Sequence, residues 1–150
     1  MVRIKHRYVI GQILFDPTQT IMDEFGSRDV INVIREKMQL LFGDIGAGEF
    51  GGNTIIKFYD ANTLIFIVRT AREAEQNLRL AMATVTQIKR NVLIMRTLSV
   101  AGCGRTCLDK LRILLCRALE AEASSLPLLD ESGRQKRQTQ YETLLQTLEL

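Results

Sequence analysis

The sequence predicts an α+β fold built on one antiparallel sheet, and three observations lead to this prediction. Apolar segments typical of strands occur at residues 8–15, 54–59, 63–69 and 91–100. Apolar residues at helical spacing follow the first and the third of these segments, and a short turn at residues 60–62 joins the two middle ones. The order βαββαβ is that of the ferredoxin-like and RRM-like folds, here followed by additional C-terminal helices.

The first predicted helix begins at Ser27 or Asp29, because either residue can cap a helix N-terminus. Its apolar positions have helical spacing; they are Val30, Ile34, Met38 and Leu41. The helix is expected to end near Phe42, because Gly43 follows. Residues 43–52 are expected to form a flexible connection. They contain the pattern G-x-G-x-x-G, but a dinucleotide site needs a strand before these glycines and a helix after them, and here the order is reversed.

The second predicted helix begins with a capping box in which Thr70 and Glu73 satisfy each other's exposed amides. Its apolar face is expected to extend as far as Ile88 and consists of Ala74, Leu78, Met82, Val85 and Ile88. A third helix is expected after the last strand, with Thr106 as its cap and Asp109 as a first-turn acid. Residues 123–133 are predicted to form a linker and residues 134–150 an amphipathic helix. We therefore expect an RRM-like domain at residues 1–122 and a C-terminal appendage at 123–150.

Both faces of the sheet are predicted to be covered. The third and fourth strands carry apolar residues on both faces, as Ile65 with Phe66 and Leu93 with Ile94 illustrate. A sheet with one solvated face would alternate apolar and polar residues instead. The first two helices account for one face. The third helix, the C-terminal tail or another protein is then expected to cover part of the other face.

Composition excludes some functional classes and leaves others open. The chain of 150 residues is 46% apolar and 25% charged, which is ordinary for a globular domain, and it contains no apolar run long enough for a membrane span. The three cysteines suggest reduced thiols inside a cell, and none has the partners of a zinc site. One histidine without a positioned acid or nucleophile argues against an enzyme. We expect no catalytic residue, no metal site and no cofactor.

Positive charge is concentrated in two segments of the chain. Residues 89–117 contain seven basic residues and one acid. The opening octet, Met1-Val2-Arg3-Ile4-Lys5-His6-Arg7-Tyr8, contains three fixed positive charges and the only histidine, without an acid. It lacks the long apolar block of a signal peptide, so these charges are expected in the mature protein. Such a distribution favours one basic face that contacts a polyanion.

The turn that follows the fourth strand is a second candidate for phosphate contact. Gly102 and Gly104 allow the backbone to approach a ligand closely, and Arg105 follows them at the predicted start of a helix. The alternative is a strand-to-helix turn that needs glycine only for its backbone angles. From the residues alone, the two interpretations are equally supported.

The opening octet, the βαββαβ order and the turn at Gly102 to Cys107 together resemble the POP-five family of protein subunits of ribonuclease P and RNase MRP. The resemblance covers about residues 1–122. At the turn, Cys103-Gly104 replaces the threonine and apolar residue usual in that family. The resemblance implies a non-catalytic subunit that braces a catalytic RNA near the 5′ leader of precursor tRNA. It also implies a TIM-barrel-like partner subunit, other POP proteins, and a nuclear and nucleolar location.

The resemblance and the charge pattern together give a set of RNA-contact candidates. The resemblance favours Arg3, Lys5, His6, Arg7, Arg105 and Thr106. Charge alone adds Arg69, Arg90, Arg96 and Lys110. Tyr8 is included because its ring could stack a base, and Gly102 because it allows close backbone approach. The strongest alternative function is a ferredoxin-like protein-interaction module without an RNA role.

Overall fold

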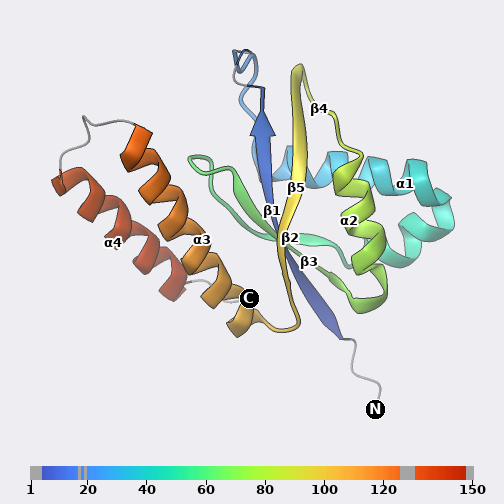
Figure 1. Ribbon diagram of the computed structural model, residues 1–150. Helices are drawn as coiled ribbons and strands as arrows, with labels where there is room; N and C mark the ends of the chain where they lie inside the picture. Colours follow the sequence, from blue (N-terminus) through green and yellow to red (C-terminus); the bar gives the residue numbers. More distant parts are fainter. Residues whose placement is uncertain (1–4, 17, 19, 126–130, 148–150) are drawn as a thin grey trace. The chain divides into compact units, whose positions relative to one another are not determined.

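The computed structural model describes residues 5–16, 18, 20–125 and 131–147. The chain divides into two compact units, Met1–Cys103 and Gly104–Leu150. The first unit contains the sheet, a long helix and a short helix, and the second contains the C-terminal helices (Figure 1). The division predicted at residue 122 stays a prediction.

The first unit is built on a five-stranded antiparallel sheet in the order β2-β3-β1-β5-β4. Its strands are β1 (His6–Phe15), β2 (Ile55–Tyr59), β3 (Ile65–Ala71), β4 (Gln87–Ile88) and β5 (Asn91–Ala101). The four long strands are the four predicted ones, and β4 is a short additional edge strand. The predicted α+β, ferredoxin-like fold class is confirmed.

One face of the sheet is covered by α1 (Ser27–Gly51) and α2 (Glu75–Ala83), which pack against each other (Figure 1). Val9 and Ile13 of β1 contribute to this core, with Phe15 packed against it, and they meet Phe66 and Val68 of β3. The side chains of the four core residues are at most 1% exposed. The alternation of strand side chains thus places one apolar stripe of each strand beneath the helices.

The predictions for α1 need two corrections. Its N-cap is Gly26, whose backbone is still extended (φ −124°, ψ −173°), and the Asp29 carboxylate accepts a hydrogen bond from the Gly26 backbone N–H at 2.9 Å. Neither Ser27 nor Asp29 is the cap; Asp29 acts from the first turn. The helical path does break at Gly43, where φ is 70°, as expected of a glycine. However, helix resumes after it and continues to Gly51, so the predicted flexible connection at 43–52 is mostly helical.

The segment between β3 and β5 also differs from its prediction. Strand β3 continues to Ala71, and the Thr70 hydroxyl lies 3.1 Å from the Thr54 hydroxyl inside the sheet. The predicted capping box is therefore wrong, and the 3-10 helix η1 (Arg72–Ala74) leads into α2 instead. Helix α2 ends at Ala83. Ile88 belongs to β4, where its apolar side chain is still buried.

The second face of the sheet is not uniformly buried. In β3, four consecutive residues from Ile65 to Val68 are at most 2% exposed, as predicted for a strand covered on both faces. In β5, by contrast, Val92 and Ile94 are 49% and 59% exposed, whereas Leu93 is buried. The prediction of two covered faces is therefore wrong for the first half of β5. Coverage of this face by the C-terminal helices stays a prediction.

The second unit consists of α3 (Gly104–Ser125) and α4 (Glu131–Thr147), which lie side by side (Figure 1). Leu115 of α3 and Tyr141 and Leu145 of α4 line a small shared cavity of about 40 Å³. Helix α3 begins two residues before Thr106, so Thr106 is not its cap and Asp109 is not in its first turn. Helix α3 extends to Ser125 and helix α4 begins at Glu131, so residues 123–125 and 131–133 of the predicted linker are helical. Residues 126–130 and 148–150 lie outside the described residues.

Candidate nucleic-acid interface

The two segments singled out by the sequence meet at one end of the sheet. Strand β1 pairs antiparallel with β5 so that Tyr8 lies opposite Ala101. This register places Arg7 next to Gly102, which follows β5. A Cβ atom built on Gly102 would lie 3.3 Å from a terminal nitrogen of the Arg7 guanidinium. The opening octet and the glycine turn are thus neighbours, although 94 positions separate their nearest residues in the sequence.

Further basic residues lie at this same end of the sheet. Strand β3 runs antiparallel to β1 and places Arg69 opposite Tyr8. The backbone N–H of Arg72 donates a hydrogen bond to the carbonyl oxygen of Lys5 at 2.8 Å. We call these residues the basic end; its members are Lys5, His6, Arg7, Arg69, Arg72 and Gly102. Arg72 was missed by the sequence analysis, because only strand pairing brings it beside the octet. Arg3 lies outside the described residues.

The basic end has no internal charge compensation among the residues that the structure describes. Lys5, Arg7, Arg69 and Arg72 form no ion pair with any of them. The guanidinium of Arg7 instead donates to the carbonyl oxygen of His6 at 3.3 Å. A group of cations without acidic partners produces a local positive potential, and such a potential attracts polyanions.

The opposite end of the sheet is also basic in sequence, but its charges are paired. Arg90 makes two hydrogen bonds to Asp23, at 2.8 and 2.6 Å, and Lys89 lies 3.0 Å from Asp29. The Arg90 guanidinium lowers the pKa of Asp23, and hydrogen bonds from Gly26 and Lys89 lower that of Asp29. Since β5 spans about 30 Å at 3.3 Å per residue, Arg90 is far from Gly102. The structure therefore does not group Arg90 with the basic end.

The remaining predicted residues fall in three other places. Arg96 lies in the middle of β5, where its guanidinium donates two hydrogen bonds to the Gln12 side-chain oxygen at 3.2 and 2.8 Å. Arg105, Thr106 and Lys110 lie in the first two turns of α3, directly after the glycine turn in the chain. Tyr8 is only 8% exposed, so its ring offers little surface for stacking on a base.

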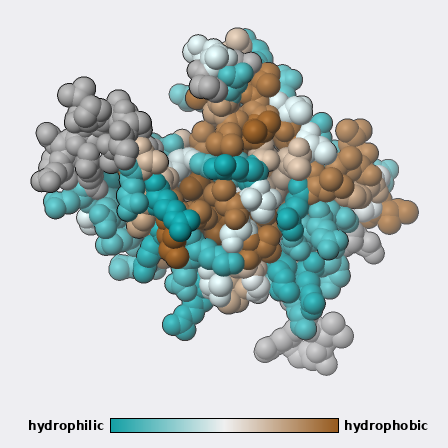
Figure 2. Space-filling model, in the orientation of Figure 1, coloured by the Kyte–Doolittle hydropathy of each residue, from teal (hydrophilic) through white to brown (hydrophobic). Residues whose placement is uncertain are grey.

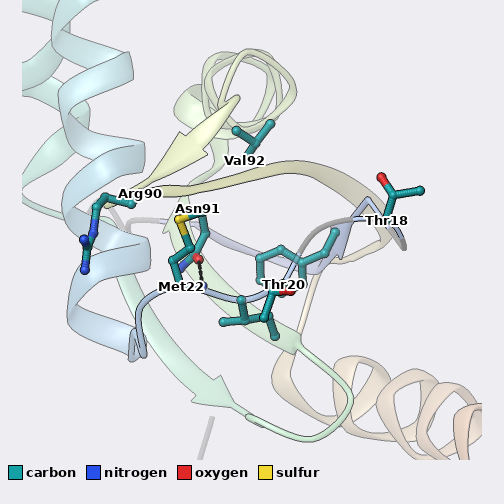
Figure 3. A pocket seen from close by; sticks show the side chains of 8 residues that line it. Thr18, Thr20, Met22, Arg90, Asn91 and Val92 are labelled. Carbon is teal, nitrogen blue, oxygen red and sulfur yellow. Dashed lines mark hydrogen bonds between the residues drawn. The ribbon is translucent and has the colours of Figure 1, made fainter.

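A pocket of about 260 Å³ lies beside the start of β5 (Figure 3). The buried Asn91 amide connects its walls: its oxygen accepts a hydrogen bond from the Met22 N–H at 2.7 Å, and its nitrogen donates to the Asp23 carbonyl oxygen at 2.7 Å. The pocket is lined by apolar residues, two threonines, Asn91 and the paired Arg90. Its lining contains no group suited to acid–base catalysis at neutral pH.

Over the described ranges, no cluster of three or more His, Cys, Asp or Glu residues is placed to hold a metal ion. None of the helices in the described part of the chain has the length and apolar character needed to cross a membrane.

The sequence matches the model of one protein family over most of its length. The model of the Rpp14/Pop5 family matches residues 7–112, which is more than half of the sequence. The chain belongs to the Rpp14/Pop5 family. The match includes Arg7, Arg69, Arg72 and the glycine turn, whereas Lys5 and His6 precede it. The predicted resemblance is confirmed.

Curated Rpp14/Pop5 relatives are similar over most of their length. The probable ribonuclease P/MRP protein subunit POP5 of Arabidopsis thaliana is 29% identical over 140 residues, covering 90% of this chain and 91% of the relative. Ribonuclease P protein component 2 of Pyrococcus abyssi is 35% identical over 101 residues, covering 67% and 79%. The human ribonuclease P/MRP protein subunit POP5 is 26% identical, covering 71% and 68%.

A solved structure supports the fold assignment. A chain in the cryo-EM structure of yeast ribonuclease MRP superposes with a TM-score of 0.52 at 14% identity, covering 86% of this chain and 99% of that chain. At this level of identity the likeness concerns the fold alone.

Proposed function

We propose that this Rpp14/Pop5 chain is a non-catalytic, RNA-binding protein subunit of a ribonuclease P or RNase MRP ribonucleoprotein. The observation that carries the proposal is the contrast between the two ends of the sheet. The cations near Arg90 are paired with Asp23 and Asp29, whereas those of the basic end have no acidic partner among the described residues. Cations left unpaired in the folded chain are available for phosphate groups.

The proposed role is structural support of a catalytic RNA. The RNA would carry out the metal-dependent cleavage that removes the 5′ leader of precursor tRNA or processes ribosomal RNA precursors. The chain would brace the RNA through phosphate contacts of the basic end and of Arg105 and Thr106 at the start of α3. Its proposed protein partners are a TIM-barrel-like subunit and other POP proteins, and its proposed location is the nucleus and nucleolus.

The test is gentle purification of the tagged full-length chain from its own cells, followed by sequencing of the RNA that accompanies it. Enrichment of a ribonuclease P or RNase MRP RNA, with precursor-tRNA or precursor-rRNA cleavage in the same fraction, is the expected result. An unrelated tagged protein of similar net charge is the control for nonspecific RNA. Material without enriched RNA would contradict the proposal.

The alternative is a protein-interaction module without an RNA role, and one observation favours it. Ile21, Met22, Val92 and Ile94 are 49% to 69% exposed. Figure 2 shows apolar surface in the region where β1 ends and β5 begins. Exposed apolar groups of this kind are typical of protein interfaces. This alternative predicts that neutralising the basic end leaves function unchanged.

A further inference from the structure

We propose that Arg69, together with His6, forms a binding position for a single phosphate group on the second face of the sheet. This inference rests on the proposed function, because it assigns one backbone phosphate of the bound RNA to these two side chains. The position lies on the face of the sheet opposite α1 and α2.

Strand pairing places the two side chains together. Arg69 lies opposite Tyr8, and His6 is two residues before Tyr8 on β1, so all three point to the same face. His6 and Arg69 are diagonal neighbours across the β1–β3 pair, a separation that long side chains bridge. Tyr8 fills the space beside them and is only 8% exposed, which limits the directions that the Arg69 side chain can take.

Each of the two side chains has a buried nitrogen without a hydrogen-bond partner. These atoms are Nδ1 of His6 and Nε of Arg69, and among the described residues they are the only buried side-chain nitrogens or oxygens without one. A buried donor without an acceptor costs free energy, and native proteins rarely leave one. Two such nitrogens on one sheet face therefore point to an acceptor that the folded chain does not itself supply. Both residues are partly exposed, and their side chains must turn outward for an external acceptor to reach these two buried nitrogens.

The surroundings favour phosphate as that acceptor. A guanidinium donates from Nε and a terminal nitrogen in a planar fork that matches the oxygens of phosphate. An imidazole Nδ1–H can donate to the same group. A carboxylate from a protein partner could satisfy one guanidinium, but Lys5, Arg7 and Arg72 at the same end of the sheet also form no described ion pair. Alternation along β1 points Arg7 to the other face from His6, so these cations surround the edge of the sheet rather than the phosphate position itself. A chain of phosphates satisfies several adjacent cations, whereas a single carboxylate satisfies one.

The first experiment observes the Arg69 Nε–H group directly in the full-length chain by ¹H–¹⁵N NMR. Its resonance is identified by its loss in Arg69→Lys, and sodium phosphate is added at constant ionic strength against a chloride control. We expect a saturable shift of the Arg69 resonance with phosphate and none with chloride. The resonance of Arg28, an exposed residue of α1, should not respond saturably. An unresponsive Arg69 resonance would overturn the inference, whatever RNA the chain binds.

The second experiment measures affinity for a transcript of the RNA recovered with the tagged chain. We expect Arg69→Gln to weaken binding about tenfold and Arg69→Lys to weaken it nearly as much, because lysine keeps the charge but loses the planar fork. Arg28→Gln is the matched control and should change affinity less than twofold. Thermal unfolding of each variant verifies its fold, and Arg69→Lys decides the result if Arg69→Gln is unstable.

The outcomes separate this inference from the proposed function. If RNA binds and both Arg69 variants match the parent chain, the proposed function stands and the phosphate position is wrong. If no RNA binds but phosphate shifts the Arg69 resonance, the proposed function fails and the anion position remains. If the Arg69 variants keep RNA affinity but lose a copurifying protein subunit, the acceptor is a protein carboxylate and the inference is overturned.

Discussion

The guanidinium of Arg7 lies against the backbone of Gly102, with 3.3 Å between its terminal nitrogen and the position that a Cβ would occupy. The two residues come from opposite ends of the sheet-forming sequence, and the antiparallel pairing of β1 with β5 brings them together. Glycine at this position leaves room for the guanidinium. The turn therefore helps to position a charged group that the proposed function assigns to RNA.

Gly102→Ala should weaken RNA affinity several-fold with little change in stability. A methyl group 3.3 Å from the Arg7 nitrogen forces the guanidinium to move by a few tenths of an ångström or more. The side chain is long enough to adjust, so the fold should tolerate the change. Gly48→Ala is the control, because no atom other than its chain neighbours and its own helix backbone lies within 4 Å of its added Cβ. Equal RNA affinity for the parent chain and Gly102→Ala would show that the position of Arg7 does not matter.

Reversing Arg3, Lys5 and Arg7 to glutamate should weaken RNA association by more than about tenfold and leave the fold intact. Each phosphate contact contributes roughly 0.7 to 0.9 to the slope of log affinity against log salt, so the slope should fall by about 2 to 3. Filter binding over a series of salt concentrations measures both quantities. Arg28→Glu with Lys37→Glu reverses two charges on α1 and is the control for a general loss of positive charge. An unchanged affinity and slope in the triple variant would contradict a role for the octet in RNA binding.

Gly11→Ala should destabilise the first unit by about 1–3 kcal/mol, the usual range for overpacking a well-packed core. A Cβ on Gly11 would lie 2.5 Å from the Phe66 ring and 2.7 Å from the Met82 terminal methyl. Both side chains are completely buried, so neither has open space to move into. Chemical denaturation measures the change, with Gly48→Ala as the comparison. A stability equal to that of the parent chain would mean that the core around Phe66 is looser than the structure indicates.

The ion pair between Asp23 and Arg90 should contribute to stability only above acidic pH. Hydrogen bonding to Arg90 lowers the pKa of Asp23 in the folded chain below its ordinary value of 3.8. A lowered folded-state pKa means that the contribution is fully present above 3.8 and is lost as pH falls below it through the folded value. The difference in unfolding midpoint between the parent chain and Asp23→Asn should therefore shrink below pH 3.8. A difference independent of pH would exclude this ionisation as its cause.

Local sequence patterns predicted the strands well and the helix ends poorly. The four long strands were found because alternation and apolar runs reflect burial directly. Thr70 was misplaced because its hydroxyl has two possible partners, an amide at a helix start or the Thr54 hydroxyl across the sheet, and only strand pairing decides between them. Ile88 was placed in a helix because it is apolar at the right spacing, yet it is buried from a strand instead.

The sequence by itself determined the fold class, the family resemblance and the presence of basic segments, because all three depend on residue type and spacing along the chain. Only the tertiary structure decided which basic residues lie together and which are neutralised. Residue type alone does not distinguish Arg69 from Arg90. Strand pairing places Arg69 beside His6 without a described acidic partner, whereas the segment 20–26 brings Asp23 to Arg90. Charge compensation depends on distances between residues remote in sequence, and folding alone sets those distances.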